Sequence, residues 1–129
     1  MILTIKTNTP ICELALYDGN NRQAEKIWES GRQLAVQLPG AIEELLKGVD
    51  MPWSDVQGIV IFQGPGSFTG LRIGSTVANT IAYAQKIPVV GTQTEDWIKQ
   101  GIARLAAKEN DKIVTPHYGS EAHITKPKK

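Results

Sequence analysis

One glycine-rich stretch constrains the fold of this chain more than any other part of it. Residues 64–74 read GPGSFTGLRIG and directly follow Gly58–Phe62, a short β-branched run bounded by turn residues, which predicts a buried strand. Gly-Pro-Gly predicts a sharp turn, because proline fixes φ and glycine adopts backbone angles closed to other residues. Ser67 or Thr69 can cap the helix that follows, which we expect to run to about Gln85. Backbone N–H groups at such a helix N-terminus can hold an anion.

The first thirty residues predict three antiparallel strands. Residues 1–7 and 11–17 are alternating apolar runs separated by Asn8-Thr9-Pro10, which is typical of paired strands joined by a tight turn. Asp18-Gly19-Asn20-Asn21 favours a second hairpin turn. Residues 22–30 alternate only weakly and carry charges, so we expect them to form an exposed edge strand.

Helical periodicity and a fifth strand complete the pattern. Between residues 33 and 49, apolar side chains recur at steps of three and four, as on one face of a helix. Pro39 interrupts this helix, so we expect it to bend there or to start late with Pro39 in its first turn. Residues 87–91 predict a strand and residues 95–108 a third helix. The order β-β-β-α-β-α-β-α predicts an α/β fold, a five-stranded mixed sheet with helices on its faces, as in a ribonuclease H-like or actin-like (ASKHA) lobe.

A ridge of small residues runs along the helix after the glycine turn, at Gly70, Gly74, Ala78 and Ala82. A glycine inside a helix costs about 0.5 to 1 kcal/mol relative to alanine, so the ridge indicates that another element approaches the helix closely. Leu71 lies on a partly different face. Either this chain's own sheet and first helix cover both faces, or one face meets a partner protein.

Composition limits the range of functions. The chain has 129 residues, of which 41% are hydrophobic and 21% charged, so we expect one globular domain. Fourteen basic residues against 13 acidic ones create no overall field for nucleic acid or membrane. The single Cys12 excludes an internal disulfide and reads as a small buried hydrophobe. The absence of a long apolar span or a signal-like N-terminus predicts a cytoplasmic protein.

Motifs for catalysis or metal binding are weak. The glycine turn reads G-x-G-x-x-x-G and lacks the Gly-Lys-Ser/Thr ending of a phosphate-binding P-loop. His117 and His123 have no cysteine or carboxylate at metal-ligand spacing, and Ser67 does not sit in G-x-S-x-G. We expect no catalytic residue, metal or cofactor. The possible anion or nucleotide contacts are Gly64, Gly66, Ser67 and Thr69.

Four segments carry a family resemblance. Residues 1–19, 28–46, 87–91 and above all GPGSFTGLRIG at 64–74 resemble the bacterial tRNA threonylcarbamoyladenosine biosynthesis family TsaB (YeaZ), over nearly the first hundred residues. The resemblance implies an actin-like lobe that has lost catalysis and serves as partner of a related catalytic subunit, TsaD. With the ATPase TsaE, that pair attaches a threonylcarbamoyl group to the adenosine beside the anticodon of certain tRNAs.

The resemblance also implies where the partner binds. In the family the subunits associate through their first two helices, which correspond here to residues 33–47 and 68–85. The resemblance thus favours the explanation in which one face of the helix with the small-residue ridge meets a partner protein. The predicted interface residues are Leu34, Leu38, Ile42, Gly70, Leu71, Gly74, Ala78 and Ala82. Without the partner, we expect a homodimer through the same face.

The chain departs from the family in three places. Lys6 stands where related kinases place a nucleotide-facing Asp, and residues 33–37 lack the His-x-x-x-His metal pair of the catalytic relative. The second lobe is almost missing, yet residues 114–128 resemble the family's C-terminal tail. We therefore expect a lobe over residues 1–111 joined to a Lys-rich tail over 112–129, which is solvated or contacts RNA.

Two functions stay open from the sequence. The first is a noncatalytic scaffold subunit that binds and activates a TsaD-like protein. The second is a minimal nucleotide-binding ATPase that uses the turn from Gly64 to Gly70 as a phosphate cradle. A peptidase activity finds no nucleophile, base and orienting group in this sequence.

Overall fold

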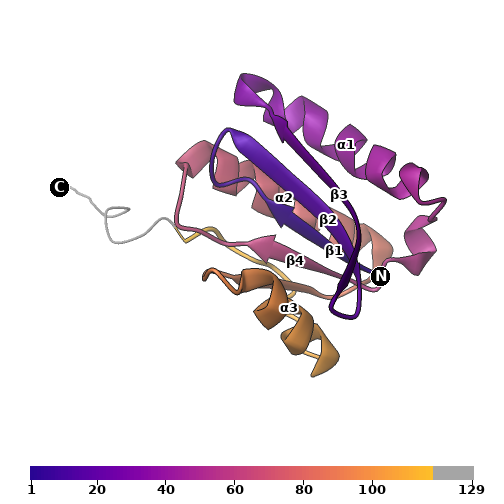
Figure 1. The fold of residues 1–129 in the computed structure, drawn as a ribbon. Helices are drawn as coiled ribbons and strands as arrows, with labels where there is room; N and C mark the ends of the chain where they lie inside the picture. The colour runs from indigo at the N-terminus through magenta and orange to yellow at the C-terminus, as the bar shows by residue number, and fades with distance from the viewer. Residues whose placement is uncertain (118–129) are drawn as a thin grey trace.

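Five strands form one mixed sheet in the order β3-β2-β1-β4-β5 (Figure 1). The computed structural model describes residues 1–117. β2 pairs antiparallel with β1 and β3, whereas β4 pairs parallel with β1 and β5. The mixed sheet and the edge position predicted for the third strand are confirmed. The strands are β1 (Ile2–Lys6), β2 (Ile11–Asp18), β3 (Asn21–Glu29), β4 (Gly58–Phe62) and β5 (Val89–Thr92).

Strand β4 is buried on both sides because helices cover the two faces of the sheet. All five residues of β4 are buried. Val60 packs against Gly101 of α3 (Trp97–Ala106), while Ile61 on the opposite face reaches Gly74 of α2 (Phe68–Gln85). The helix α1 (Leu34–Gly48) packs beside α2 and against β2 and β3. Figure 1 shows α3 on the side of the sheet away from α1 and α2.

The first helix accommodates Pro39 in its interior. A short 3-10 turn, η1 (Gly31–Gln33), leads into α1, which is helical from Leu34. The alternative of a late start with Pro39 in the first turn is therefore wrong. Proline lacks an N–H, so the Ala35 carbonyl loses its intrahelical hydrogen bond. Burial of the inner stripe offsets this loss; its buried members are Leu34, Leu38, Ala41, Ile42, Leu45 and Leu46.

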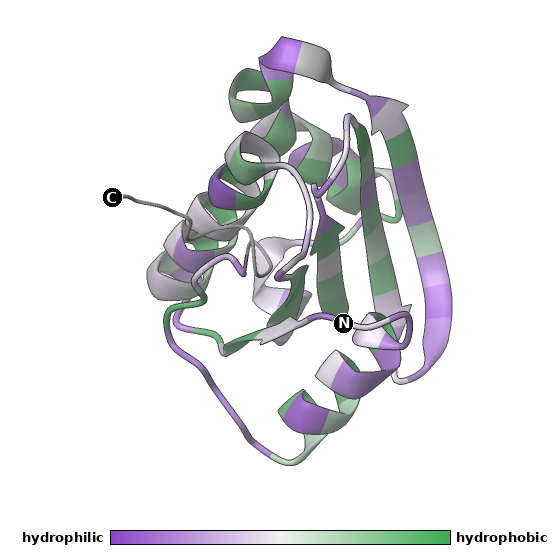
Figure 2. Cartoon of the chain, turned by 90° about the vertical axis from the view of Figure 1, so that its left-hand side faces the viewer, coloured by the Kyte–Doolittle hydropathy of each residue, from purple (hydrophilic) through white to green (hydrophobic). Residues whose placement is uncertain are grey.

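The edge strand β3 is tied to α1 by polar contacts. Lys26 Nζ lies 3.1 Å from Glu44 Oε1, and Trp28 Nε1 donates a hydrogen bond to Gln37 Oε1 at 3.0 Å. Hydrophobic residues concentrate in the central strands and on the inward sides of the helices, whereas polar residues lie outside (Figure 2). In the described part of the chain, no helix is both long and apolar enough to cross a membrane.

After α3 the chain returns across the sheet as residues 110–117, which we call the strap. Asp111 N donates to Val89 O of β5, and His117 N donates to Gln63 O at the end of β4. Between these two points Val114 is 2% exposed and belongs to the main core. The part of the predicted tail up to His117 thus packs on the lobe, and its remainder lies outside the described residues. The 3-10 turn η2 (Trp53–Asp55) completes the elements.

Candidate partner interface

The glycine turn is packed against its own chain. Gly64 has φ of 132°, a value that side-chain-bearing residues rarely adopt, and a Cβ there would overlap the His117 carbonyl of the strap. A Cβ on Gly66 would overlap Asn8. Both glycines therefore permit close approach of other parts of this chain. Their role as contacts for an anion remains a prediction.

The remaining two anion candidates lie at the start of α2. Ser67 and Thr69 were the two predicted N-caps of this helix. Ser67 is the N-cap in the structure, because its Oγ accepts a hydrogen bond from Gly70 N at 3.3 Å. Its own N–H donates to Asn8 O at 2.8 Å. Thr69 is exposed in the first turn of the helix. The turn thus fixes the start of α2 against the end of β1.

The small-residue ridge packs on the sheet of this chain. Thr7, just after β1, donates its hydroxyl to Gly70 O at 2.7 Å, and a Cβ on Gly74 would overlap Thr7 Oγ1. Ala78 and Ala82 are 0% and 4% exposed in the main core. These contacts agree with the first of the two explanations of the ridge, in which this chain's own elements cover it.

Most of the residues predicted for the partner interface are buried within this chain. Seven of its eight residues are buried and Gly70 is only partly accessible. These side chains hold α1 and α2 onto the sheet and have little surface to offer a partner. The buried members are Leu34, Leu38, Ile42, Leu71, Gly74, Ala78 and Ala82.

The same two helices nevertheless present an apolar outer surface. Val36 is 78% exposed and Phe68 is 57% exposed. Between the two helices lies a shallow groove of about 380 Å³, lined by Ala35, Phe68, Thr69, Arg72, Ile73, Thr76 and Val77. We define the outer helical face as these residues together with Val36. Sequence reasoning missed Val36 and Phe68, although an apolar residue outside the inner stripe of α1 was a usable signal.

The described residues offer little for catalysis. They contain no group of three or more His, Cys, Asp or Glu side chains that could hold a metal ion. Cys12 is fully buried, as predicted. Burial raises the pKa of its thiol more than the hydrogen bond with Ser30 lowers it, which disfavours the nucleophilic thiolate. His123 lies outside the described residues.

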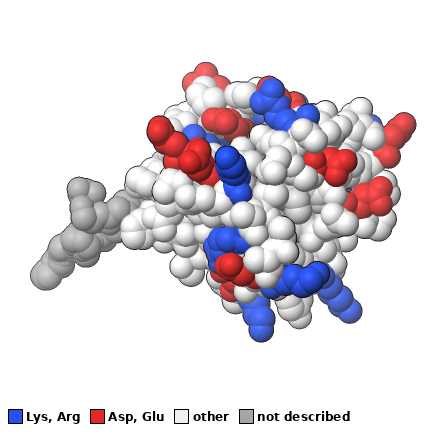
Figure 3. Space-filling model, turned by 60° about the horizontal axis from the view of Figure 1, so that its bottom comes forward, with Lys and Arg blue, Asp and Glu red and all other residues white. Residues whose placement is uncertain are grey.

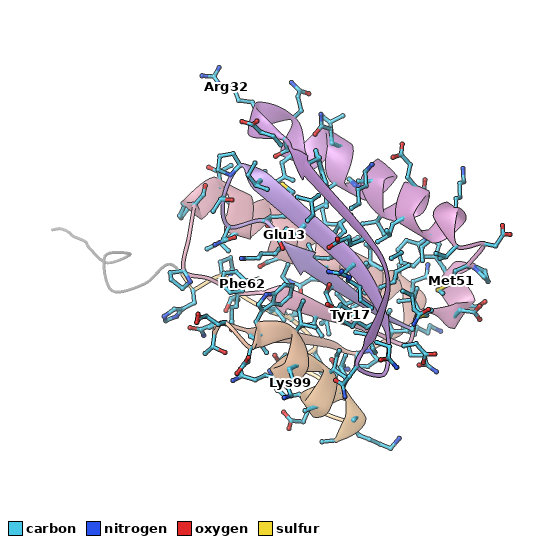
Figure 4. All side chains as sticks on the ribbon, in the orientation of Figure 1. Glu13, Tyr17, Arg32, Met51, Phe62 and Lys99 are labelled. Carbon is cyan, nitrogen blue, oxygen red and sulfur yellow. The ribbon has the colours of Figure 1, made fainter. Side chains whose placement is uncertain are left out.

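Lys6 is held on the sheet face that also carries α3. Its Nζ lies 3.8 Å from Glu13 Oε2 and 5.1 Å from the centroid of the Phe62 ring. Figure 4 shows Glu13 on β2 and Phe62 on β4, the strands on either side of β1. An ammonium group so placed cannot act as the metal-binding carboxylate of the related kinases.

Charge is mixed over the surface seen from the α3 side. Figure 3 shows acidic and basic side chains on this face, with Lys and Arg gathered toward its lower edge. Arg104 of α3 donates hydrogen bonds to the carboxylates of Asp111 and Glu109. These hydrogen bonds raise the pKa of Arg104, so its guanidinium stays charged.

Comparison with known proteins agrees with this fold. Residues 28–112 match the family described as TsaD, tRNA N6-adenosine threonylcarbamoyltransferase. The tRNA threonylcarbamoyladenosine biosynthesis protein TsaB of Bacillus subtilis is 38% identical over 68% of this chain and 38% of its own length. TsaB of Escherichia coli is 29% identical over 82% of this chain and 48% of its own length.

The similarity extends to a solved three-dimensional structure. YeaZ from Pseudomonas aeruginosa superimposes with a TM-score of 0.67 at 27% identity, over 78% of this chain and 49% of that one. The predicted ASKHA-like lobe is thus confirmed. The chain spans less than half the length of each of these three relatives. The family match over residues 28–112 and these similarities show that the chain belongs to the TsaD family, in which it resembles the TsaB (YeaZ) proteins.

Proposed function

We propose that this chain is a noncatalytic scaffold subunit in tRNA threonylcarbamoyladenosine biosynthesis. It binds a TsaD-like catalytic subunit through the outer helical face of α1 and α2. A TsaE-like ATPase and the tRNA join through that larger complex. The names of the similar proteins support the pathway, and the similarity of residues 28–112 to the TsaD family supports a partner of related fold.

The observation that carries the proposal is the exposure of two large apolar side chains on α1 and α2, of which Phe68 lines the groove. Val36 on α1 and Phe68 on α2 keep 78% and 57% of their surface accessible. Burying such side chains provides about 25 cal/mol per Å² of apolar surface, and aromatic anchors seated against pockets dominate interface energies. Arg72 lines the same groove and adds a charge that can select an acidic residue on the partner.

The noncatalytic part of the proposal follows from the turn and from Lys6. Gly64 is buried against the His117 carbonyl, and Lys6 faces Glu13. A buried Gly64 offers a phosphate less backbone to contact, which favours the noncatalytic subunit over the ATPase alternative. Calorimetric titration with ATP and ADP tests this part, because tight nucleotide binding by the chain alone supports the ATPase alternative.

Binding to the cognate TsaD-like protein tests the interface. Val36→Asp and Phe68→Asp place a charge on the outer helical face without touching the core. We expect each to weaken the complex by about tenfold or more, since truncating an interface anchor costs about 2 kcal/mol or more. Isothermal titration calorimetry measures the affinity, and circular dichroism checks that the variants fold.

The matched control is Ile27→Asp. Ile27 on β3 is 54% exposed and stands on an edge strand of the sheet, away from the outer helical face. It should leave the affinity unchanged. Full-affinity binding by folded Phe68→Asp would reject this interface. Gel filtration of the chain alone tests whether the same face also forms the expected homodimer.

A further inference from the structure

The free edge of β5 is hydrogen-bonded by side chains and the strap instead of by a sixth strand. β5 pairs with β4 on its inner side through the backbone of Pro88 and Thr92, among others. The backbone groups of Val89 and Gly91 therefore point away from the sheet. Such outward N–H and C=O groups on an edge strand are ready to pair with another strand.

All four of these outward groups have a partner. Val89 N donates to Asn110 Oδ1 at 3.2 Å, and Val89 O accepts from Asp111 N at 2.9 Å. Gly91 N donates to Asp111 Oδ2 at 2.9 Å, and Gly91 O accepts from Arg104 Nη1 at 3.0 Å. Three side chains, those of Asn110, Asp111 and Arg104, and the backbone N–H of Asp111 thus replace the four hydrogen bonds of a neighbouring strand.

The arrangement is held by a second layer of contacts. Arg104 binds Asp111 through both terminal nitrogens and Glu109 through Nε at 2.7 Å. Asn110 Oδ1 also accepts a hydrogen bond from Lys112 N at 2.8 Å. Hydrogen bonds between ionised groups are stronger than neutral ones, so the Asp111 carboxylate, which bonds both Arg104 and Gly91 N, makes the strongest contacts of this group.

We propose that Arg104, Asn110 and Asp111 seal a self-association surface, and that the occupant of the unsealed edge is β5 of a second copy of this chain. A twofold axis at Val90 would set Val89 of one copy opposite Gly91 of the other. Each such pair exchanges two antiparallel hydrogen bonds. The dimer would thereby form four bonds, which pair all eight outward backbone groups of the two copies. This surface lies across the molecule from β3, the other edge, and is separate from the outer helical face.

The test opens the seal by removing the carboxylate. Asp111→Ala removes the acceptor for Gly91 N and the partner of Arg104. Sedimentation velocity over a wide concentration range should show self-association about tenfold or more stronger than in the wild type. Both proteins carry Phe68→Asp, so that association through the helical face does not contribute. The control Glu109→Ala keeps the Arg104–Asp111 contact and should behave as the wild type.

Amide hydrogen exchange at Val89 and Gly91 identifies the surface used. In the associated variant both amides should be as protected as in the wild type, and dilution to monomer should make the Gly91 amide, which has lost its acceptor, exchange faster. A folded variant that stays monomeric, or associates while these amides exchange fast, overturns the proposal. If Asp111→Ala does not fold, Arg104→Ala carries the same test, because it removes the donor to Gly91 O and the cation that holds the Asp111 carboxylate. Failure here leaves the TsaD-like interface untouched, because the two surfaces share no residue.

Discussion

Thr7 joins β1 to α2 by contacting Gly70 and Gly74, the two glycines of the small-residue ridge. Its hydroxyl donates to Gly70 O at 2.7 Å, and the same oxygen occupies the space that a Cβ on Gly74 would need. On its other side, a Cβ on Gly74 would also lie 3.4 Å from Ile61 Cδ1 of β4. The absence of a side chain at position 74 thus sets how closely α2 approaches the sheet.

Gly74→Ala should therefore destabilise the protein although alanine favours helices. We expect a loss of about 1 to 3 kcal/mol, the cost of overpacking a close-packed core, measured as the free energy of unfolding in urea. Gly40→Ala in α1 is the matched control, because nothing lies within 4 Å of its Cβ position. It should stabilise by about 0.5 to 1 kcal/mol. Equal effects at the two sites would contradict the close-approach explanation.

Asn79 of α2 holds the strap by a two-way backbone contact. Its Nδ2 donates to Val114 O at 2.9 Å, and its Oδ1 accepts from Val114 N at 2.8 Å. Asn79→Ala leaves both partly buried backbone groups unpaired, which should cost about 1 to 3 kcal/mol. Chemical denaturation measures the loss.

Thr80→Ala serves as the control for Asn79. Its hydroxyl bonds only the Thr76 carbonyl of the same exposed helix turn, so the substitution should change stability by less than about 0.5 kcal/mol. Proteolysis gives a second readout, since release of the strap in Asn79→Ala should speed cleavage near residues 110–117. Unchanged cleavage would mean that the strap is held without Asn79.

Asp111 should make stability depend on pH in the acid range. Burial raises the pKa of this carboxyl, but the hydrogen bonds from Arg104 and Gly91 and the charge of Arg104 outweigh it, so the pKa lies below its ordinary 3.8. The unfolded chain then binds the proton more readily than the folded one. The stabilisation is present above the unfolded pKa and is lost as pH falls through the lower folded pKa.

The measurement is the stability difference between the wild type and Asp111→Asn across that range. The wild type should be the more stable at pH 6, and the difference should shrink as the pH falls below 3.8. Asp50, which is exposed at the end of α1, provides the control substitution Asp50→Asn. A difference that stays constant with pH would show that Asp111 acts through packing instead of charge.

Most of the fold was predictable because its signals are local. The alternation in residues 11–17, the turn at 64–66 and the spacing from Leu34 to Leu46 each identify an element without knowledge of the rest. The site was not predictable in the same way. A stripe of apolar residues on a helix shows that a face is buried, but not whether the sheet or a partner buries it.

Contacts distant in sequence supplied the remainder. Thr7 meets Gly74, and Asp111 meets Gly91, only after the parallel strands have assembled. No pattern within either segment encodes these pairs. The resemblance to TsaB proteins directed attention to α1 and α2, whereas the exposure of Val36 and Phe68 was visible only in the structure.

Cys12 should resist thiol reagents in the folded protein. It is 0% exposed, and its sulfur lies 3.2 Å from Ser30 Oγ. Because burial also raises the pKa of the thiol, both access and the thiolate fraction are low. Labelling with a maleimide at neutral pH should be slow and should accelerate with urea as the protein opens.

Ile27→Cys in a Cys12→Ala background places a thiol at a site that is 54% exposed, and it should react at the rate of a free cysteine. Comparable rates at the two positions in native buffer would show that β2 opens readily at Cys12.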